Sequence, residues 1–241
     1  MLIFLEALMD QIKRFFGYFS KTELVLWFSS LLFILLSFIA FDRENHLTLV
    51  ASLIGASSLI FNAKGNPFGQ VLIILFSLLY GIISFRFSYY GEMITYLGMT
   101  APMALFALIS WLRHPYNGNR AEVKANRIGA GEVVFMLILS VLVTVLFYFI
   151  LAAFHTANML PSTLSVTTSF IAVYLTARRS PYFALAYAAN DLVLIVLWAL
   201  ASAEDSAYLS VLVCFAMFLV NDIYGFISWI KMLERQQRGP N

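Results

Sequence analysis

Residues 132–154 read EVVFMLILSVLVTVLFYFILAAF, and only the first of them is charged. A helix needs about 20 apolar residues to cross a hydrocarbon core of about 30 Å, so this stretch predicts a membrane-spanning helix. The rest of the chain has the same character, since 61% of its 241 residues are hydrophobic and 12% are charged. An ordinary soluble domain has about 25% charged residues. The composition therefore predicts an all-α integral membrane protein.

Runs of similar length and apolarity lie on both sides of this stretch, between charged or Gly- and Pro-rich breaks. Together they predict eight transmembrane helices, at residues 23–41, 47–62, 68–87, 91–112, 132–154, 161–176, 182–201 and 207–230. Residues 1–20 place Glu6, Asp10 and Lys13 along one side of a helix and apolar side chains along the other. This pattern favours an amphipathic helix that lies along the headgroups, with a short extra span as the alternative.

The basic residues predict the orientation of the spans. Eight spans put both termini on one side, and that side holds Lys13, Arg14, Lys21, Lys64, Arg113, Arg120, Lys124, Arg127, Arg178, Arg179, Lys231, Arg235 and Arg238. Only Arg43 and Arg86 fall on the other side, where the outer loops are expected to hold Asp42, Glu44, Glu92, Glu204 and Asp205. Because cytoplasmic loops are rich in Lys and Arg, we predict a multi-pass protein of the inner (plasma) membrane with both termini in the cytoplasm.

Two short motifs recur in the same order and indicate an internal repeat. AKGNPF at 63–68 matches ARRSPY at 177–182, and ISWLR at 109–113 matches ISWIK at 227–231. The repeat predicts two parallel three-helix units joined by one linker helix, a 3+1+3 arrangement with one extra span before it. Parallel repeats are a transporter plan in which substrate binds between the halves near the bilayer midplane. The architecture therefore favours transport of a small polar solute.

The repeat and the spans divide the chain into six segments. They are residues 1–20, the amphipathic interfacial helix; 21–46, the extra first span; 47–115, the first three-helix repeat; 116–155, a cytoplasmic loop and the linker span; 156–232, the second three-helix repeat; and 233–241, a cytoplasmic tail.

Two acids inside predicted spans are the first candidates for a binding site. A charged group costs about 2.5–3.5 kcal/mol at the centre of a membrane helix on insertion scales, so Asp191 and Asp222 are expected to serve a function. The alternative is that they make interhelical hydrogen bonds or pair with Arg86. Amides, aromatic rings and polar groups near them or in the first repeat complete the predicted substrate site, which consists of Gln70, Tyr80, Tyr187, Asn190, Asp191, Trp198, Asn221, Asp222 and Tyr224. Such a site suits a flat ring with a cationic or amide group and sugar hydroxyls.

Other residues carry structural expectations. Tyr89, Tyr90, Trp111 and Trp229 are predicted to belong to the aromatic belt at the membrane interfaces. Pro102 lies within a span, where it could act as a kink or a hinge.

The sequence offers little for catalysis or for metal binding. His46, His114 and His155 lie in loops or at span ends without metal-ligand spacing, and no Gly-rich phosphate loop is present. We predict no catalytic residues, no metal and no cofactor. The net charge of +2 does not suggest nucleic acid as a partner. A membrane-embedded enzyme and a non-transporting receptor remain as alternatives from other classes, and a homo-oligomer is left open.

The chain resembles the PnuC-type vitamin transporter family. The features that carry the resemblance are the 3+1+3 plan and the motifs YGE at 90–92, ISWLRHP at 109–115, RRSPY at 178–182 and NDIYG at 221–225. Many members have paired tryptophans shortly before the Asn or Asp of the seventh span, where this chain has Phe183 and Ala186 beside Tyr187.

The resemblance implies a fold similar to the SWEET proteins and uptake of nicotinamide riboside by facilitated diffusion for NAD biosynthesis. It also implies trapping of the substrate by a cytoplasmic kinase that phosphorylates it. Relatives that carry thiamine, riboflavin or deoxynucleosides leave those solutes as alternatives.

Overall fold

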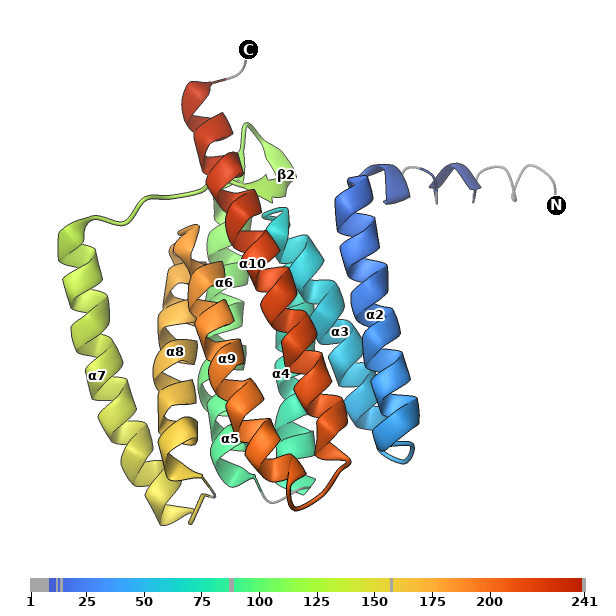
Figure 1. Cartoon of the computed structure of the whole chain (residues 1–241). Helices are drawn as coiled ribbons and strands as arrows, with labels where there is room; N and C mark the ends of the chain where they lie inside the picture. Colours follow the sequence, from blue (N-terminus) through green and yellow to red (C-terminus); the bar gives the residue numbers. More distant parts are fainter. Residues whose placement is uncertain (1–8, 12, 14, 87–88, 157, 240–241) are drawn as a thin grey trace.

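The structure is a computed structural model that describes residues 9–11, 13, 15–86, 89–156 and 158–239. Within these ranges, eight helices or helix runs are long and apolar enough to cross a membrane (Figure 1). In chain order the elements are α2 (Lys21–Phe41), α3 (His46–Ala63), α4 (Phe68–Arg86), α5 (Tyr90–Ile94), η1 (Thr95–Thr100), α6 (Ala101–Arg113), β1 (Pro115–Tyr116), β2 (Asn119–Val123), α7 (Ala130–Ala153), α8 (Met159–Ala177), α9 (Tyr182–Ser202) and α10 (Tyr208–Arg238). The prediction of eight spans is confirmed, with α5, η1 and α6 forming the fourth.

Six spans form a closed ring. Each predicted unit contributes three consecutive helices, α3–α4–α6 and α8–α9–α10, and the third helix of each unit packs on the first helix of the other. Two spans lie outside the ring: α2 packs against α3 and α10, and α7 packs against α8 (Figure 1). The outward sides of α2 and α7 are rich in exposed large hydrophobic residues, as lipid-facing helices require.

The repeated motifs hold the ring together through reciprocal hydrogen bonds. Trp229 Nε1 donates to the carbonyl oxygen of Asn62 at 2.7 Å, and Trp111 Nε1 donates to that of Thr176 at 2.9 Å. The neighbouring hydroxyls act in the same way, since Ser228 bonds the carbonyl of Ala63, and Ser110 that of Ala177, both at 2.8 Å. Each unit therefore supplies donors to carbonyls in the last turn of the other unit's first helix, where Asn62 and Thr176 also accept the N–H of Gly65 and Arg179.

These contacts correct one prediction about the tryptophans. Trp111 and Trp229 are both 0% exposed, and their ring centroids lie 5.3 Å apart. The expectation that they belong to an interfacial aromatic belt is wrong, because a belt residue contacts lipid and water. Instead the indoles pack between the units, where each N–H needs a buried acceptor.

The fourth span is irregular where Pro102 enters it. Pro102 lacks an N–H and its ring crowds the carbonyl of residue 98, so a regular α-helix cannot continue through this point. The backbone adopts a π-helix from Thr95 to Thr100 and resumes as α6 directly afterwards. The preceding turn, α5, buries Glu92 to 3% exposure, so the prediction of this acid in an outer loop is wrong.

The segment after α6 contains a small β-hairpin that the all-helical prediction omitted. β1 and β2 pair antiparallel, and the turn between them is Asn117–Gly118, with φ of 48° and 77°. Positive φ at both positions is the geometry of a two-residue hairpin turn, for which Asn-Gly is the strongest sequence signal. The hairpin lies at the same end of the bundle as the C-terminal half of α10 and the start of α2 (Figure 1). We call this end the basic face, since it carries Lys64, Arg178 and Arg235.

The two ends of the chain can be compared with the predicted segments. α10 continues to Arg238, well past the predicted span end at residue 230. Leu2, Leu5, Glu6 and Leu8 of the predicted amphipathic helix lie outside the described residues. Of the described part, residues 9–11, 13 and 15–17 are helical and turn away from α2 (Figure 1).

Candidate functional site

A cavity lies inside the ring, between the two units. Side chains from α3, α4, η1, α8, α9 and α10 line it: Leu59, Asn62, Ile73, Phe76, Tyr96, Thr100, Ser169, Phe183, Tyr187, Asn190, Asp191, Phe215, Phe218 and Asp222. Its volume is about 50 Å³. None of these lining residues is Lys or Arg, so the charged groups in the wall are both acids.

The two acids meet across neighbouring helices. Asp191 on α9 is 3% exposed and Asp222 on α10 is 5% exposed, and both carboxyl groups line the cavity between the units. Neither acid forms a salt bridge in the part of the chain that the structure describes. Arg86 is not a partner in any ion pair within the described residues.

Asn190 is held by hydroxyl groups of α8. Its Oδ1 accepts hydrogen bonds from Thr168 Oγ1 at 2.8 Å and from Ser169 Oγ at 3.0 Å. These bonds fix the orientation of the amide beside the acids. Tyr187, one helical turn before Asp191, also lines the cavity. The sequence thus located four of the lining residues: Tyr187, Asn190, Asp191 and Asp222.

Gln70 lies behind the cavity wall. Gln70 is 2% exposed and its Nε2 donates to Asn62 Oδ1 at 2.9 Å, and it is Asn62 that lines the cavity. The close approach needs a glycine next to Gln70, since a Cβ at Gly69 would lie 2.2 Å from Asn62 Oδ1. Sequence reasoning missed Asn62 because it sits at the end of α3, directly before the first repeated motif.

Tyr80 and Trp198 lie in an aromatic cluster between the cavity and the opposite face of the bundle. The Tyr80 ring is 4.6 Å from the ring of Tyr96, which lines the cavity, and Trp198 packs 5.4 Å from both Tyr89 and Tyr208. Trp198 was predicted from its helical spacing to share a face of α9 with Asp191. Seven residues also separate the two by about 10 Å along the helix axis, which places Trp198 beyond the cavity. Neither aromatic side chain is among the cavity-lining residues.

Asn221 and Tyr224 face away from the cavity, towards α2. Asn221 Nδ2 donates to Ser30 Oγ at 2.8 Å, and Tyr224 Oη donates to Glu23 Oε1 at 3.2 Å. The bond to Ser30 holds Asn221 on the side of α10 that meets α2, whereas Asp222 lines the cavity. Both residues were predicted to bind substrate, but neither lines the cavity. Instead, both connect α10 to the outer helix α2.

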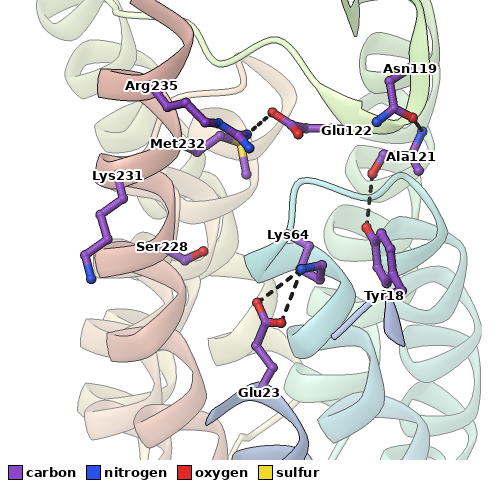
Figure 2. Close-up of a pocket in the computed structure, with 10 residues that line it drawn as sticks. All are labelled: Tyr18, Glu23, Lys64, Asn119, Ala121, Glu122, Ser228, Lys231, Met232 and Arg235. Carbon is purple, nitrogen blue, oxygen red and sulfur yellow. Dashed lines mark hydrogen bonds and ion pairs between the residues drawn. The ribbon is translucent and has the colours of Figure 1, made fainter. Parts of the chain in front are cut away.

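A second pocket, of about 300 Å³, opens at the basic face between α2, α3, α10 and the hairpin (Figure 2). Lys64 Nζ lies 3.2 Å from Glu23 Oε2, and Arg235 pairs with Glu122. Burial raises the pKa of the Tyr18 phenol, and this neutral hydroxyl donates to the carbonyl of Ala121 at 3.2 Å. The pocket's charges are therefore largely paired among themselves.

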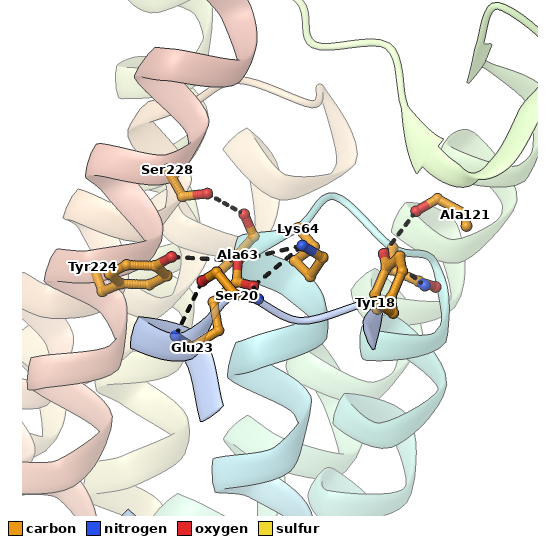
Figure 3. A network of polar contacts seen from close by, with 9 residues as sticks. Tyr18, Ser20, Glu23, Ala63, Lys64, Ala121, Tyr224 and Ser228 are labelled. Atoms are coloured by element: carbon orange, nitrogen blue, oxygen red, sulfur yellow. Dashed lines mark hydrogen bonds and ion pairs between the residues drawn. The ribbon is translucent and has the colours of Figure 1, made fainter. Parts of the chain in front are cut away.

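Glu23 is the centre of the polar network beside this pocket (Figure 3). It accepts from the backbone N–H of Ser20 at 2.7 Å, from Lys64 and from Tyr224, while Ser20 Oγ accepts from the N–H of Glu23. This capping box starts α2, and the other two bonds join α2 to α3 and α10. The network has a structural role that requires no ligand.

Metal binding finds no support in the described part of the chain. No group of three or more His, Cys, Asp or Glu side chains there could hold a metal ion. The site that remains is the central cavity with its two acids, its amides and its aromatic rings.

Comparison with known proteins gives matches over almost the whole chain. The sequence profile of the nicotinamide mononucleotide transporter family matches residues 45–231. The nicotinamide riboside transporter PnuC of Neisseria mucosa is 28% identical over 230 residues, which cover 92% of this chain and 86% of the relative. The crystal structure of the vitamin B3 transporter PnuC is similar with a TM-score of 0.81 at 25% identity, covering 94% of this chain and 97% of that one.

Proposed function

Because the chain belongs to the nicotinamide mononucleotide transporter family, we propose that it carries nicotinamide riboside across the membrane by facilitated diffusion. It is a multi-pass membrane transporter and not an enzyme. The observation that carries the substrate proposal is the central cavity, where Asp191 and Asp222 lie among aromatic side chains. Nicotinamide riboside combines a flat pyridinium ring of fixed positive charge, a carboxamide and ribose hydroxyls, and this wall offers a partner for each.

In the proposed complex the pyridinium ring stacks on Tyr187 or a neighbouring phenylalanine. The acid pair balances its positive charge, and the amides of Asn62 and Asn190 bind the carboxamide or the ribose hydroxyls. Gln70 positions Asn62 through their hydrogen bond. Small-molecule pockets typically measure about 300–1,000 Å³, and the cavity measures about 50 Å³. Binding therefore requires the two units to move apart, as rocking of repeats would do.

The cavity's charge favours the riboside over the phosphorylated mononucleotide. A phosphate monoester carries about −1.5 to −2 charges at neutral pH. The cavity presents two carboxyl groups and no basic side chain among its lining residues. A phosphate would meet a negative group in a buried setting with no cation to pair with, which costs several kcal/mol.

The same charge argument supports trapping by a cytoplasmic kinase. Once the riboside is phosphorylated, the product carries the charge that the cavity disfavours, so it does not return. Entry needs no ion gradient, because a negative-inside potential favours inward movement of a cation by about 2.3 kcal/mol per 100 mV. The excess of Lys and Arg on the basic face supports a cytoplasmic location for this face and for both termini.

Uptake into liposomes tests the proposal. Purified protein in vesicles without a proton or sodium gradient should take up labelled nicotinamide riboside, and unlabelled riboside should compete while the mononucleotide should not. Thiamine, riboflavin and deoxynucleosides form the competitor panel for the alternative substrates. Uptake that requires a proton or sodium gradient would exclude facilitated diffusion, and stronger competition by another vitamin would replace the substrate.

A further inference from the structure

Residues 115–128 cross the basic face from the end of α6 towards the start of α7, and we call them the strap. They belong to the only covalent connection between the two units. Two backbone N–H groups of the strap bind the turns that follow the first helix of each unit: Val123 donates to the carbonyl of Gly65 and Asn126 to the carbonyl of Arg179, both at 2.9 Å. Gly65 and Arg179 occupy the same position in the repeated motif. One short segment therefore holds the equivalent point of both units.

The strap also closes the space beneath it. Val123 is 0% exposed and packs in one hydrophobic cluster with Trp111, Trp229 and Phe183. Phe183 is at the same time part of the cavity wall. Between the cavity and the basic face there is thus a layer of aromatic rings, and the side chain of Val123 belongs to that layer.

Side chains anchor the strap to the last turns of α10. Glu122 pairs with Arg235, as Figure 2 shows, and accepts from Gln236 Nε2 at 2.8 Å. The same glutamine donates to the carbonyl of Val123 at 3.0 Å and accepts from the N–H of Ala125 at 2.8 Å. The strap begins in the first unit and is bound along its length to the second.

We propose that the strap is the latch of the basic face, and that solute passes between the cavity and this face only when the strap, which continues from the first unit, releases the second unit at α10 and at the turn of Arg179. The inference rests on the proposed transport through the central cavity. Val123 and Asn126 are three residues apart, and an extended chain spans at most about 3.3–3.6 Å per residue. While both bonds hold, the carbonyl oxygens of Gly65 and Arg179 can lie at most about 16 Å apart, which is the span of three extended residues plus two hydrogen bonds of 2.9 Å. The strap therefore limits how far the ends of the units can separate.

At the opposite face, the order of the helices provides no connection that runs from one three-helix unit to the other. The connections at that face, residues 42–45, 87–89, 154–158 and 203–207, each join consecutive helices without passing from one three-helix unit to the other. Opening there does not require the strap to move. The latch therefore acts on one face of the membrane, although the helices around the cavity follow a repeat.

A reversible cross-link tests the latch. In a Cys214→Ser background, which removes the single cysteine, Glu122→Cys with Arg235→Cys is joined by a short bifunctional thiosulfonate and later released by reductant. The matched control is Tyr116→Cys with Asn119→Cys, which pairs the two strands of the hairpin with each other. The 122–235 link should slow uptake of labelled nicotinamide riboside by at least about tenfold, as for a locked lid, and reductant should restore it. Unchanged uptake with this link closed, or equal inhibition by the control link, overturns the latch.

A second measurement does not depend on the substrate. Thr100 lines the cavity, so Thr100→Cys in the same background reports its accessibility to a membrane-impermeant maleimide added at the basic face. The 122–235 link should suppress labelling. Glu122→Gln should raise the labelling rate about two- to fivefold, the range expected from loss of a partly exposed ion pair, and the swapped pair Glu122→Arg with Arg235→Glu should return it.

The two measurements separate the two proposals. Labelling that follows the strap while nicotinamide riboside is not transported supports the latch and rejects the substrate. Transport of nicotinamide riboside together with labelling that ignores the link rejects the latch and supports the substrate.

Discussion

The two three-helix units share a skeleton. In both, the first helix ends in a turn with a positive φ, at Gly65 in one and Arg179 in the other, and a proline follows two residues later. In both, a tryptophan from the other unit's third helix donates to a carbonyl of that turn. These contacts lie at the basic face, where the units meet and where the strap binds both.

Near the cavity the units differ in chemistry. At the repeat offset of the first motif, Asp191 corresponds to Ser77 and Asn190 to Phe76; at the offset of the second, Asp222 corresponds to Ala104. The second unit supplies both acids, while the first supplies Asn62 and mostly apolar or aromatic side chains. The contacts between the units are reciprocal, so both units need the residues that make them. A single bound solute needs its charge balanced only once, so the acids can both lie in one unit.

Removing the shared tryptophans should have the largest effect. Trp111→Ala and Trp229→Ala each delete a fully buried ring and its hydrogen bond to a carbonyl of the other unit. Each should lower the free energy of unfolding by about 3–5 kcal/mol, and the two losses should be similar because the contacts are equivalent. Thermal unfolding of the detergent-solubilised protein measures this. The control is Trp27→Ala, because Trp27 lies on α2, outside the ring, and it should cost less. A large loss for one ring tryptophan and a small loss for the other would mean that the reciprocal bonds are not equivalent.

Neutralising the acids should separate the units by function. Asp191→Asn and Asp222→Asn keep the shape of the side chain and remove a charge, so each should weaken binding of nicotinamide riboside about 10- to 100-fold, the equivalent of about 1.5–3 kcal/mol for a charged hydrogen bond. Reduced nicotinamide riboside has a neutral ring and should lose much less. The matched change in the first unit, Ser77→Ala, should leave binding within about twofold. Isothermal titration gives the affinities, and an equal loss for the charged and neutral ligands would contradict a charge-balancing role.

The sequence predicted the spans because length and apolarity are what a membrane requires of a helix. It predicted the repeat from residues that turned out to be the contact points between the units, since Ser110 and Trp111 bond the turn of the second unit as Ser228 and Trp229 bond that of the first. It did not predict the direction of the tryptophans, because an indole near a span end looks the same whether it faces lipid or a buried carbonyl. The hairpin has its signal in Asn117–Gly118, which lie within the predicted cytoplasmic loop.

The site was predicted in part, for a related physical reason. Helical spacing places Tyr187 and Asp191 on one face correctly, but it does not state which neighbour that face meets. Asn221 follows the pattern of Asn190 in sequence, yet it bonds Ser30 of the outer helix. Asn62 could not be found by spacing, because it reaches the cavity from a helix end and is held there by Gln70.

Gln70 allows a smaller test of the first unit's contribution. Gln70→Met keeps the size of the side chain and removes the donor to Asn62 Oδ1, so the amide of Asn62 loses its fixed orientation. Affinity for nicotinamide riboside should fall about 3- to 10-fold, consistent with about 1 kcal/mol for a neutral hydrogen bond. Asn62→Ala in the same background should add little further loss if the two residues act together. Additive losses in this double-mutant cycle would mean that Gln70 does not act through Asn62.

The smallest effect should come from the turn at which one unit has glycine and the other has arginine. Arg179 has φ of 59° at the position that Gly65 fills in the other unit with φ of 65°. A side chain in this left-handed region costs about 1–2 kcal/mol, and glycine avoids that cost. Burial, together with the neighbouring Arg178, also lowers the pKa of the Arg179 guanidinium. Arg179→Gly should therefore raise the free energy of unfolding by up to about 1 kcal/mol, although glycine gains entropy in the unfolded chain.

Two control variants separate the contributions at this turn. Arg179→Ala removes the charge and keeps the strain, so it should give less stabilisation than glycine. Gly65→Ala should be destabilising, because its Cβ would also lie 3.1 Å from Met232 Cε and 3.2 Å from Val123 Cγ1 of the strap. Thermal unfolding of the three variants measures the differences. Equal stabilisation by glycine and alanine at position 179 would mean that the gain comes from removing the charge. It would contradict a contribution from backbone strain at the positive φ of Arg179.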